Sequence, residues 1–285
     1  MQTAEGYFDY CISEACVIDE DFVVTAKKLE EWGYRTIAIN QILHESNQEP
    51  RKKKKKGEPR DNLDIVPVPV DVKKFENNTK LKILNRLTIS FSNSDIFNKI
   101  TKSPNYKLYH IIAVIPLTQA ALHYTCSSLE ADIISIDLEN KIPYRLTRGV
   151  YFQLVEKNIH FEILYSPTIE DHTSRINMIH ISHLYHSLGK SKNIITSSGA
   201  TKRILLRPPL DVRNFFRGFI FGLNEEQANN SILCNGRIVY LNSVGRKRGK
   251  TFMLVENTAE KTNCEKIKDI EEMEVDGPVL KKHKK

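Results

Sequence analysis

Short apolar runs alternate with helix-length amphipathic segments along most of the chain. The clearest unit is a β-rich run at His160–Tyr165, a helical pattern at Asp171–Leu188 and a second apolar run at Asn193–Thr196. A strand, a crossover helix and a strand place the two strands parallel and adjacent. The small residues of Ser197–Ala200 then lie at the carboxyl end of the second strand, where α/β proteins carry ligand sites.

This unit recurs and predicts seven strands. They centre on Tyr7–Ile12, Thr36–Asn40, Arg86–Ile89, His110–Ile115, Asp132–Ile136, His160–Tyr165 and Asn193–Thr196. Seven strands alternating with helices favour an α/β barrel, although no eighth strand is evident. Gly33 and Gly189 are expected to close the helices before two of the strands. Two later helices, beginning at Asp211 and capped by Asn224, are expected to plug or flank the gap.

Two segments depart from this rhythm. Residues 44–80 are rich in lysine and proline, with apolar content only near Ile65–Val70, and we interpret them as an exposed insertion. From Arg246 onward charge dominates and aromatic residues nearly vanish, which predicts a disordered tail over residues 246–285. The sequence therefore predicts one barrel domain over residues 1–245.

The net charge of +7 is concentrated in those two segments. Residues 51–60 carry a balance of +6 and residues 246–285 a balance of +3, which leaves the remaining body at −2. Any RNA footprint on the body must therefore be local, and the lysines at 52–56 favour a solvated tract or a nuclear address. Five scattered cysteines without a CxxC pair indicate a reducing compartment. Without a membrane-length apolar run, we expect a soluble intracellular protein.

A run of three histidines invites a metal site but does not support one. His180, His183 and His186 form an HxxHxxH pattern. On a helical wheel they fall opposite the apolar arc and therefore toward solvent. Helical zinc sites more often use histidines four residues apart with a nearby carboxylate, so no metal is predicted here.

The segment after the last strand is a better candidate site. Ser197 and Ser198 are small enough to let a phosphate approach the backbone, and Lys202, Arg203 and Arg207 add positive charge. These residues predict contact with phosphate, RNA or an acidic partner. The alternative for the segment is a tight turn beside incidental surface cations. The alternative for Arg207 is a pair with Asp211 that holds the turn before the next helix.

Arg86 is unusual because it lies inside an apolar strand. A buried guanidinium needs a carboxylate partner or an anionic ligand. The sequence leaves both readings open: a core ion pair with Asp9 or Asp137, or contact with RNA or a partner.

Several short motifs in order resemble one known family. They are Ala38–Asn40, Asn85–Ile89, Phe161–Pro167, Asn193–Ser198, Arg207-x-Pro-x-Asp211-Val212 and Asn235-x-Arg237. In this order and spacing they resemble the thirty-kilodalton protein subunit of ribonuclease P, over about residues 5–245. The insertion at 44–80 is longer and more basic than expected for the family, and the tail follows no family pattern. The resemblance therefore assigns no function to either segment.

The resemblance implies a barrel related to the triosephosphate-isomerase and polymerase/histidinol-phosphatase barrels. It also implies a noncatalytic role in the particle that removes 5′ leaders from precursor tRNA and, in eukaryotes, in ribonuclease MRP, which acts on precursor rRNA. The implied partners are the catalytic RNA, precursor tRNA and small RRM-like protein subunits, and Arg237 joins the expected contact residues. The RNA is expected to hold Mg²⁺ and the protein no cofactor, in the nucleus and nucleolus.

A stand-alone metal-dependent phosphoesterase is the alternative on the same barrel. Such an enzyme needs His, Asp or Glu side chains that converge at the strand ends, typically beginning with a His-x-His pair on the first strand. Here the first strand reads Phe8-Asp9-Tyr10-Cys11, and the other ends offer Asn40, Ser90, Pro116 and Ser197. These are poor ligands for a dinuclear centre, so the sequence argues against independent hydrolysis.

Overall fold

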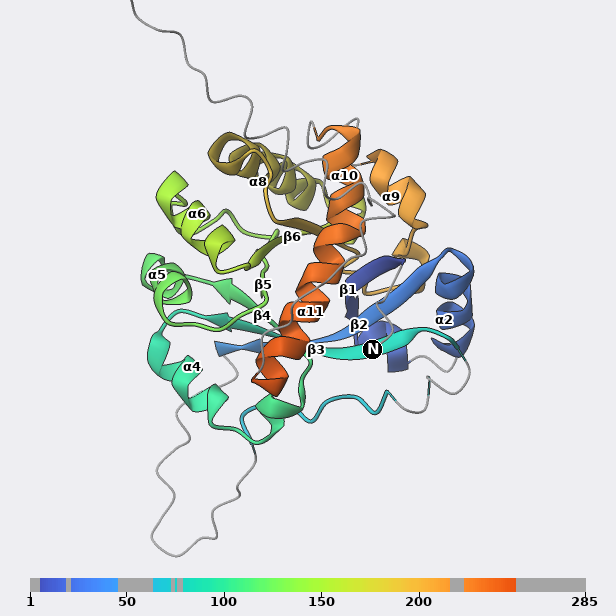
Figure 1. Ribbon diagram of the computed structural model, residues 1–285, viewed down its shortest axis with the longest axis horizontal. Coiled ribbons are helices and arrows are strands. Elements are labelled where there is room, and N and C mark those ends of the chain that lie inside the picture. The colour runs from blue at the N-terminus through green and yellow to red at the C-terminus, as the bar shows by residue number, and fades with distance from the viewer. Residues whose placement is uncertain are drawn as a thin grey trace, which may run out of the picture. The chain divides into compact units, whose positions relative to one another are not determined.

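Seven parallel strands pair in chain order in the computed structural model, which describes residues 6–18, 22–45, 64–72, 75, 79–215 and 223–249 (Figure 1). They are β1 (Tyr7–Ser13), β2 (Tyr34–His44), β3 (Lys82–Phe91), β4 (Ile111–Pro116), β5 (Ile133–Ile134), β6 (His160–Leu164) and β7 (Ile194–Ser197). Strands covered on both faces require nearly continuous apolar runs, which is why the sequence pattern located them. The predicted TIM-like barrel is confirmed.

The barrel closes where the ends of β1 and β7 meet. A parallel bridge joins Ile12 to Ala200, just beyond β7. The Ser13 amide donates to the Ala200 carbonyl at 3.0 Å, and the Gly199 amide donates to the Cys11 carbonyl at 2.7 Å. These bonds satisfy strand-edge groups that an eighth strand would otherwise pair.

Helices connect the strands, and those between consecutive strands cover the outside of the barrel. They are α1 (Ala15–Ile18), α2 (Phe22–Glu31), α4 (Ser94–Thr101), α5 (Gln119–Ser127), α6 (Arg148–Glu156), α7 (Ser166–Glu170), α8 (His172–Gly189), α9 (Pro209–Phe215), α10 (Glu225–Ile232) and α11 (Cys234–Arg248), with 3₁₀ turns η2 (Asn105–Leu108) and η3 (Arg203–Leu205). None of the described helices combines the length and apolar character needed to cross a bilayer.

The two late helices that the sequence predicted lie at the seam. The predicted capping box of α10 is present, since the Asn224 side chain accepts from the Gln227 amide and the Gln227 side chain accepts from the Asn224 amide. This helix packs against β7 and β1, where the Thr196 hydroxyl donates to Ser231 at 3.2 Å. α9 packs against α10, so the pair flanks the seam.

Helix α11, which the sequence patterns did not reveal, crosses the amino-terminal ends of the strands (Figure 1). Its Asn235 side chain donates to the Ile194 carbonyl at 2.7 Å. The Tyr10 hydroxyl, inside the barrel, donates to the Gly236 carbonyl at 2.6 Å. Val239 and Tyr240 complete the interior apolar cluster contributed by the strands. α11 is therefore the element that plugs the barrel.

Arg246 belongs to this plug and not to a charged tail. Its guanidinium contacts the Asp132 carboxylate at 2.8 Å and donates to the His110 carbonyl at 2.8 Å. α11 thus continues through Arg248, past the expected boundary at residue 245, because a buried carboxylate draws the basic residue onto the barrel. The expected disorder of the remaining tail concerns residues 250–285, which lie outside the described residues.

Part of the expected insertion also packs against the barrel. Val66 is buried, and the Tyr109 hydroxyl donates to the Pro67 carbonyl at 3.0 Å. The Asn85 amide group donates to the Val70 carbonyl at 2.8 Å. The expected exposure was therefore wrong for Val66 and its half-buried neighbours Pro67 and Val70, because barrel side chains satisfy backbone carbonyls there. Asp64, Ile65, Val68 and Asp71 are exposed, as expected. Residues 46–63 lie outside the described part of the chain.

The two predicted glycine caps differ in outcome. Gly33 has φ +93° after α2, as expected for a left-handed cap. Gly189 is instead the last helical residue of α8, and Lys190 takes the left-handed conformation with φ +48°. The glycine is needed for space, since a Cβ at position 189 would lie 1.9 Å from the Tyr151 ring.

Candidate nucleic-acid interface

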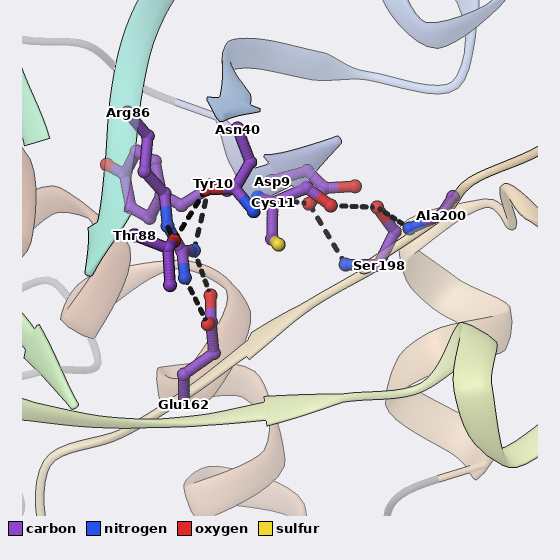
Figure 2. Close-up of polar contacts among 9 residues, drawn as sticks. All are labelled: Asp9, Tyr10, Cys11, Asn40, Arg86, Thr88, Glu162, Ser198 and Ala200. Carbon is purple, nitrogen blue, oxygen red and sulfur yellow. Dashed lines mark hydrogen bonds and ion pairs between the residues drawn. The ribbon is translucent and has the colours of Figure 1, made fainter. Parts of the chain in front are cut away.

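The barrel interior contains a buried ion pair in place of an open site (Figure 2). Arg86 and Glu162 have fully buried side chains, and the guanidinium contacts the two carboxylate oxygens at 2.5 and 2.6 Å. Arg86 also donates to the Thr88 hydroxyl at 3.1 Å and to the Tyr10 carbonyl at 3.0 Å. Burial alone would raise the pKa of Glu162, but the charge and hydrogen bonds of Arg86 hold that pKa below its usual value.

This pair decides between the two readings of Arg86. The core ion pair is correct, but its partner is Glu162 and not Asp9 or Asp137. The carboxylate neutralises a guanidinium that water cannot reach, so Arg86 has a structural role and is not available for contact with RNA or a partner.

Asp9 and Ser198 hold the seam of the barrel together (Figure 2). One Asp9 carboxylate oxygen accepts from the Ser198 amide at 3.0 Å and from the Cys11 amide at 3.1 Å. The Ser198 hydroxyl donates to the Cys11 carbonyl at 2.9 Å. Burial raises the pKa of Asp9 despite these bonds. Ser197 and Ser198 are both buried, so the structure places neither on a contact surface.

The predicted cations after β7 do share one surface cavity. A cavity of about 920 Å³ lies between α2 and residues 201–211, and we name it the α2 groove. Lys202, Arg203 and Arg207 line this cavity together with Lys28 of α2. Four cationic side chains from two distant parts of the sequence therefore gather at one place, as a local anion-binding surface requires.

Arg207 is positioned by its backbone and remains exposed. The Tyr165 hydroxyl accepts from the Arg207 amide at 3.1 Å, and the Tyr34 hydroxyl donates to the Arg207 carbonyl at 3.0 Å. The guanidinium donates to the Ile204 carbonyl at 2.9 Å. Both Arg207 and Asp211 are described, and no ion pair joins them, so the alternative reading of Arg207 is not supported.

The other predicted contact residues occupy different positions. Lys202 pairs with Glu170 at 2.9 Å, and both side chains are exposed, so solvent screens the pair. Arg237 is half-buried on α11, which crosses the amino-terminal end of the barrel. Sequence reasoning missed Lys28, whose ammonium lies 5.0 Å from the centre of the Trp32 ring. The available signal was the four-residue spacing between this lysine and Trp32, a half-buried aromatic residue just after the helix.

The histidine run lies on the outer face of α8, as the helical wheel predicted, and His180, His183 and His186 are exposed. Among the described residues, no three His, Cys, Asp or Glu side chains are grouped so that they could hold a metal ion.

Comparisons with known proteins agree on one family. The family model of RNase P subunit p30 matches residues 6–248. The chain is 32% identical over 218 residues to ribonuclease P protein subunit p30 of Mus musculus, covering 75% of this chain and 78% of that protein. It is 28% identical over 234 residues to probable ribonuclease P protein subunit 3 of Schizosaccharomyces pombe, covering 81% of this chain and 90% of that one.

The fold is shared with a chain in a cryo-EM structure of archaeal ribonuclease P with mature tRNA. The TM-score is 0.59, and the match covers 90% of this chain and 99% of that one. At 16% identity this likeness supports the fold alone.

Proposed function

This chain belongs to the RNase P subunit p30 family, and we infer from that membership that it is a noncatalytic protein subunit of ribonuclease P. In this role it supports RNA-catalysed removal of 5′ leaders from precursor tRNA. The observation that carries the inference is the family match over residues 6–248, which spans the barrel from β1 to the end of α11.

The barrel interior supports a noncatalytic role over the phosphoesterase alternative. A hydrolase on this fold would need metal-ligating side chains converging at the carboxyl ends of the strands. Here the interior carboxylate of Glu162 is neutralised by Arg86, and Asp9 accepts hydrogen bonds that close the barrel. Their carboxylates already have structural partners and are buried away from a substrate.

The α2 groove is the surface that we propose for RNA contact. Arg207 and Lys28 are exposed there, and Arg203 lies beside them. Phosphate contacts by such side chains provide affinity without reading sequence. Lys202 contributes less in this proposal because Glu170 already pairs with it.

The wider assignments follow from the same membership. We propose action within ribonuclease MRP on precursor rRNA, a nuclear and nucleolar location, and assembly with small RRM-like protein subunits. The Mg²⁺ ions of the reaction are assigned to the partner RNA, which is the catalytic component in this proposal.

Purification of the tagged protein from its own cells tests the proposed function. Sequencing of the co-purifying RNA should yield a structured ribonuclease P-like RNA, and the assembled particle should cleave precursor tRNA. The recombinant protein alone, assayed with Mg²⁺, should not cleave it. Cleavage by the isolated protein with a stoichiometric bound metal would instead support the phosphoesterase.

A further inference from the structure

A second cavity lies where α4, η2 and α5 meet the last turn of α11. Its volume is about 520 Å³, and we name it the α11 pocket. It shares no lining residue with the α2 groove. Its lining combines aromatic rings with lysines, namely Phe97, Tyr106, Tyr124, Lys107 and Lys247, together with the carboxylate of Glu130.

The aromatic side of the pocket is built on Phe97. The Tyr106 and Tyr124 rings pack edgewise against it, with ring centres 6.4 and 6.3 Å away. Both tyrosines are half-buried, while Phe97 is buried beneath them. The Tyr124 hydroxyl is further positioned by donation to the Asn98 side chain at 3.1 Å. The rings are therefore held in place and partly open to the cavity.

Positive charge dominates the rim next to these rings. Lys107 and Lys247 are exposed, and Lys247 donates to the Leu108 carbonyl at 3.0 Å. Although the Lys247 side chain is exposed, partial desolvation against the protein surface and the neighbouring charge of Arg246 lower its pKa. Arg246 is already paired with Asp132. Among the described residues that line the pocket, Glu130 supplies the negative charge. An anion bound here would relieve the repulsion between Lys247 and Arg246.

We propose that the α11 pocket binds one unpaired nucleotide of the partner RNA, with its base against Tyr106 or Tyr124 and its phosphate at Lys107 and Lys247. This proposal rests on the proposed function and adds a second RNA contact to it. Single-stranded nucleic acid is bound where aromatic rings stack on bases and nearby cations pair with the backbone. The cavity falls within the roughly 300–1,000 Å³ of typical small-ligand sites.

Binding of a fluorescein-labelled octauridylate to the full-length protein, measured by anisotropy, tests the pocket. Tyr124→Leu should weaken binding roughly tenfold, whereas Tyr124→Phe keeps the ring and should bind as the wild type does. Lys107→Ala with Lys247→Ala should reduce the slope of log affinity against log salt by about 0.7, the value for one lost phosphate contact on a single strand, while Lys141→Ala, an exposed lysine outside the pocket, should not. Melting temperatures identify any variant that fails to fold.

Photocrosslinking with 4-thiouridine-substituted oligouridylate gives a readout independent of mutation, and the crosslinks should map to Tyr106 or Tyr124. Unchanged binding in the folded Tyr124→Leu and lysine variants, or crosslinks confined to other segments, would overturn the proposal. Loss of a co-purifying protein with RNA affinity intact would also overturn it. The proposed function fails separately, when the wild-type protein co-purifies no structured RNA.

Discussion

At the scale of single residues, the feature with the largest effect on stability is a pair of opposite charges buried away from water. Arg86 and Glu162 both have 0% side-chain exposure and satisfy each other through two contacts. Because both side chains are buried, removing either one leaves an uncompensated charge in the interior and destabilises the fold. The interior of the barrel, where β3 and β6 carry this pair, is thus organised for stability.

Glu162→Gln should lower the free energy of unfolding by about 3–5 kcal/mol, because it leaves the Arg86 charge buried without a counter-charge. The double variant Arg86→Met/Glu162→Leu removes both charges and should lose much less. Urea denaturation at neutral pH measures both. Equal losses in the single and double variants would show that packing, and not charge, sets the cost.

Glu162 also predicts part of the acid sensitivity. Because its pKa in the folded state lies below the ordinary value of 4.5, its contribution is complete above that value and is lost as pH falls toward the folded pKa. Asp9 acts in the opposite direction, since its raised pKa favours the folded state as pH falls. Asp9→Asn should therefore steepen the loss of stability as pH falls toward 3.8, the ordinary pKa of an aspartate, measured by denaturation across pH. A shallower loss would contradict this assignment.

At the scale of elements, close packing decides where glycine is required. α8 approaches α6 so closely that a Cβ at Gly189 would collide with the Tyr151 ring, which itself stacks on Phe161 at 4.3 Å. Gly149 in α6 has no neighbouring atom within 4 Å of the same position. The two glycines therefore serve different purposes within adjacent helices.

Gly189→Ala should destabilise the protein by about 1–3 kcal/mol through overpacking. Gly149→Ala should stabilise it by up to about 1 kcal/mol, because alanine favours the helix and meets no obstacle. Thermal denaturation of the two variants compares them directly. A neutral Gly189→Ala would mean that the Tyr151 ring can move at little cost.

The last turn of α11 gives a second test at this scale. Arg246→Ala leaves the buried Asp132 carboxylate without its partner and should cost about 2 kcal/mol, less than for a fully buried pair because the arginine keeps 17% exposure. Arg248→Ala, which removes an exposed side chain from the same last turn of α11, is the control. Equal melting temperatures for the two variants would place Arg246 outside the fold.

At the scale of the whole molecule, the barrel brings together cations that are far apart in the sequence. The crossover from β1 to β2 supplies Lys28, and the segment after β7 supplies Arg203 and Arg207, because the seam makes the first and last strands neighbours. A basic surface is thereby formed on a body whose net charge is not basic.

Arg207→Ala and Lys28→Ala should each weaken RNA binding and reduce its salt slope by about 0.7–0.9, with little loss of stability. Lys27→Ala changes an exposed neighbour that does not line the groove and should leave the slope unchanged. Affinity for the partner RNA across salt, with melting temperature on the same samples, provides the measurement. A destabilised Arg207→Ala whose folded fraction binds normally would remove Arg207 from the interface.

Local patterns were enough to determine the seven strands, the seam helices α9 and α10 and the exposed histidines. These features depend on apolar periodicity and capping, which neighbouring residues specify. They were not enough to reveal α11. Its apolar residues face the ends of several strands at once, and its helical pattern is interrupted by Gly236 and by polar residues with partners on the barrel.

By itself the sequence determined that Arg86 needs an anionic partner, that the charge lies mainly in peripheral segments, and that the chain resembles one family. The tertiary structure alone decided that the partner is Glu162, 76 residues away, and that Ser198 closes the seam. It also moved Arg246 from a tail to the barrel. The physical reason is common to all three: a buried polar group is satisfied by whichever group the fold brings within reach, and sequence distance does not set that choice.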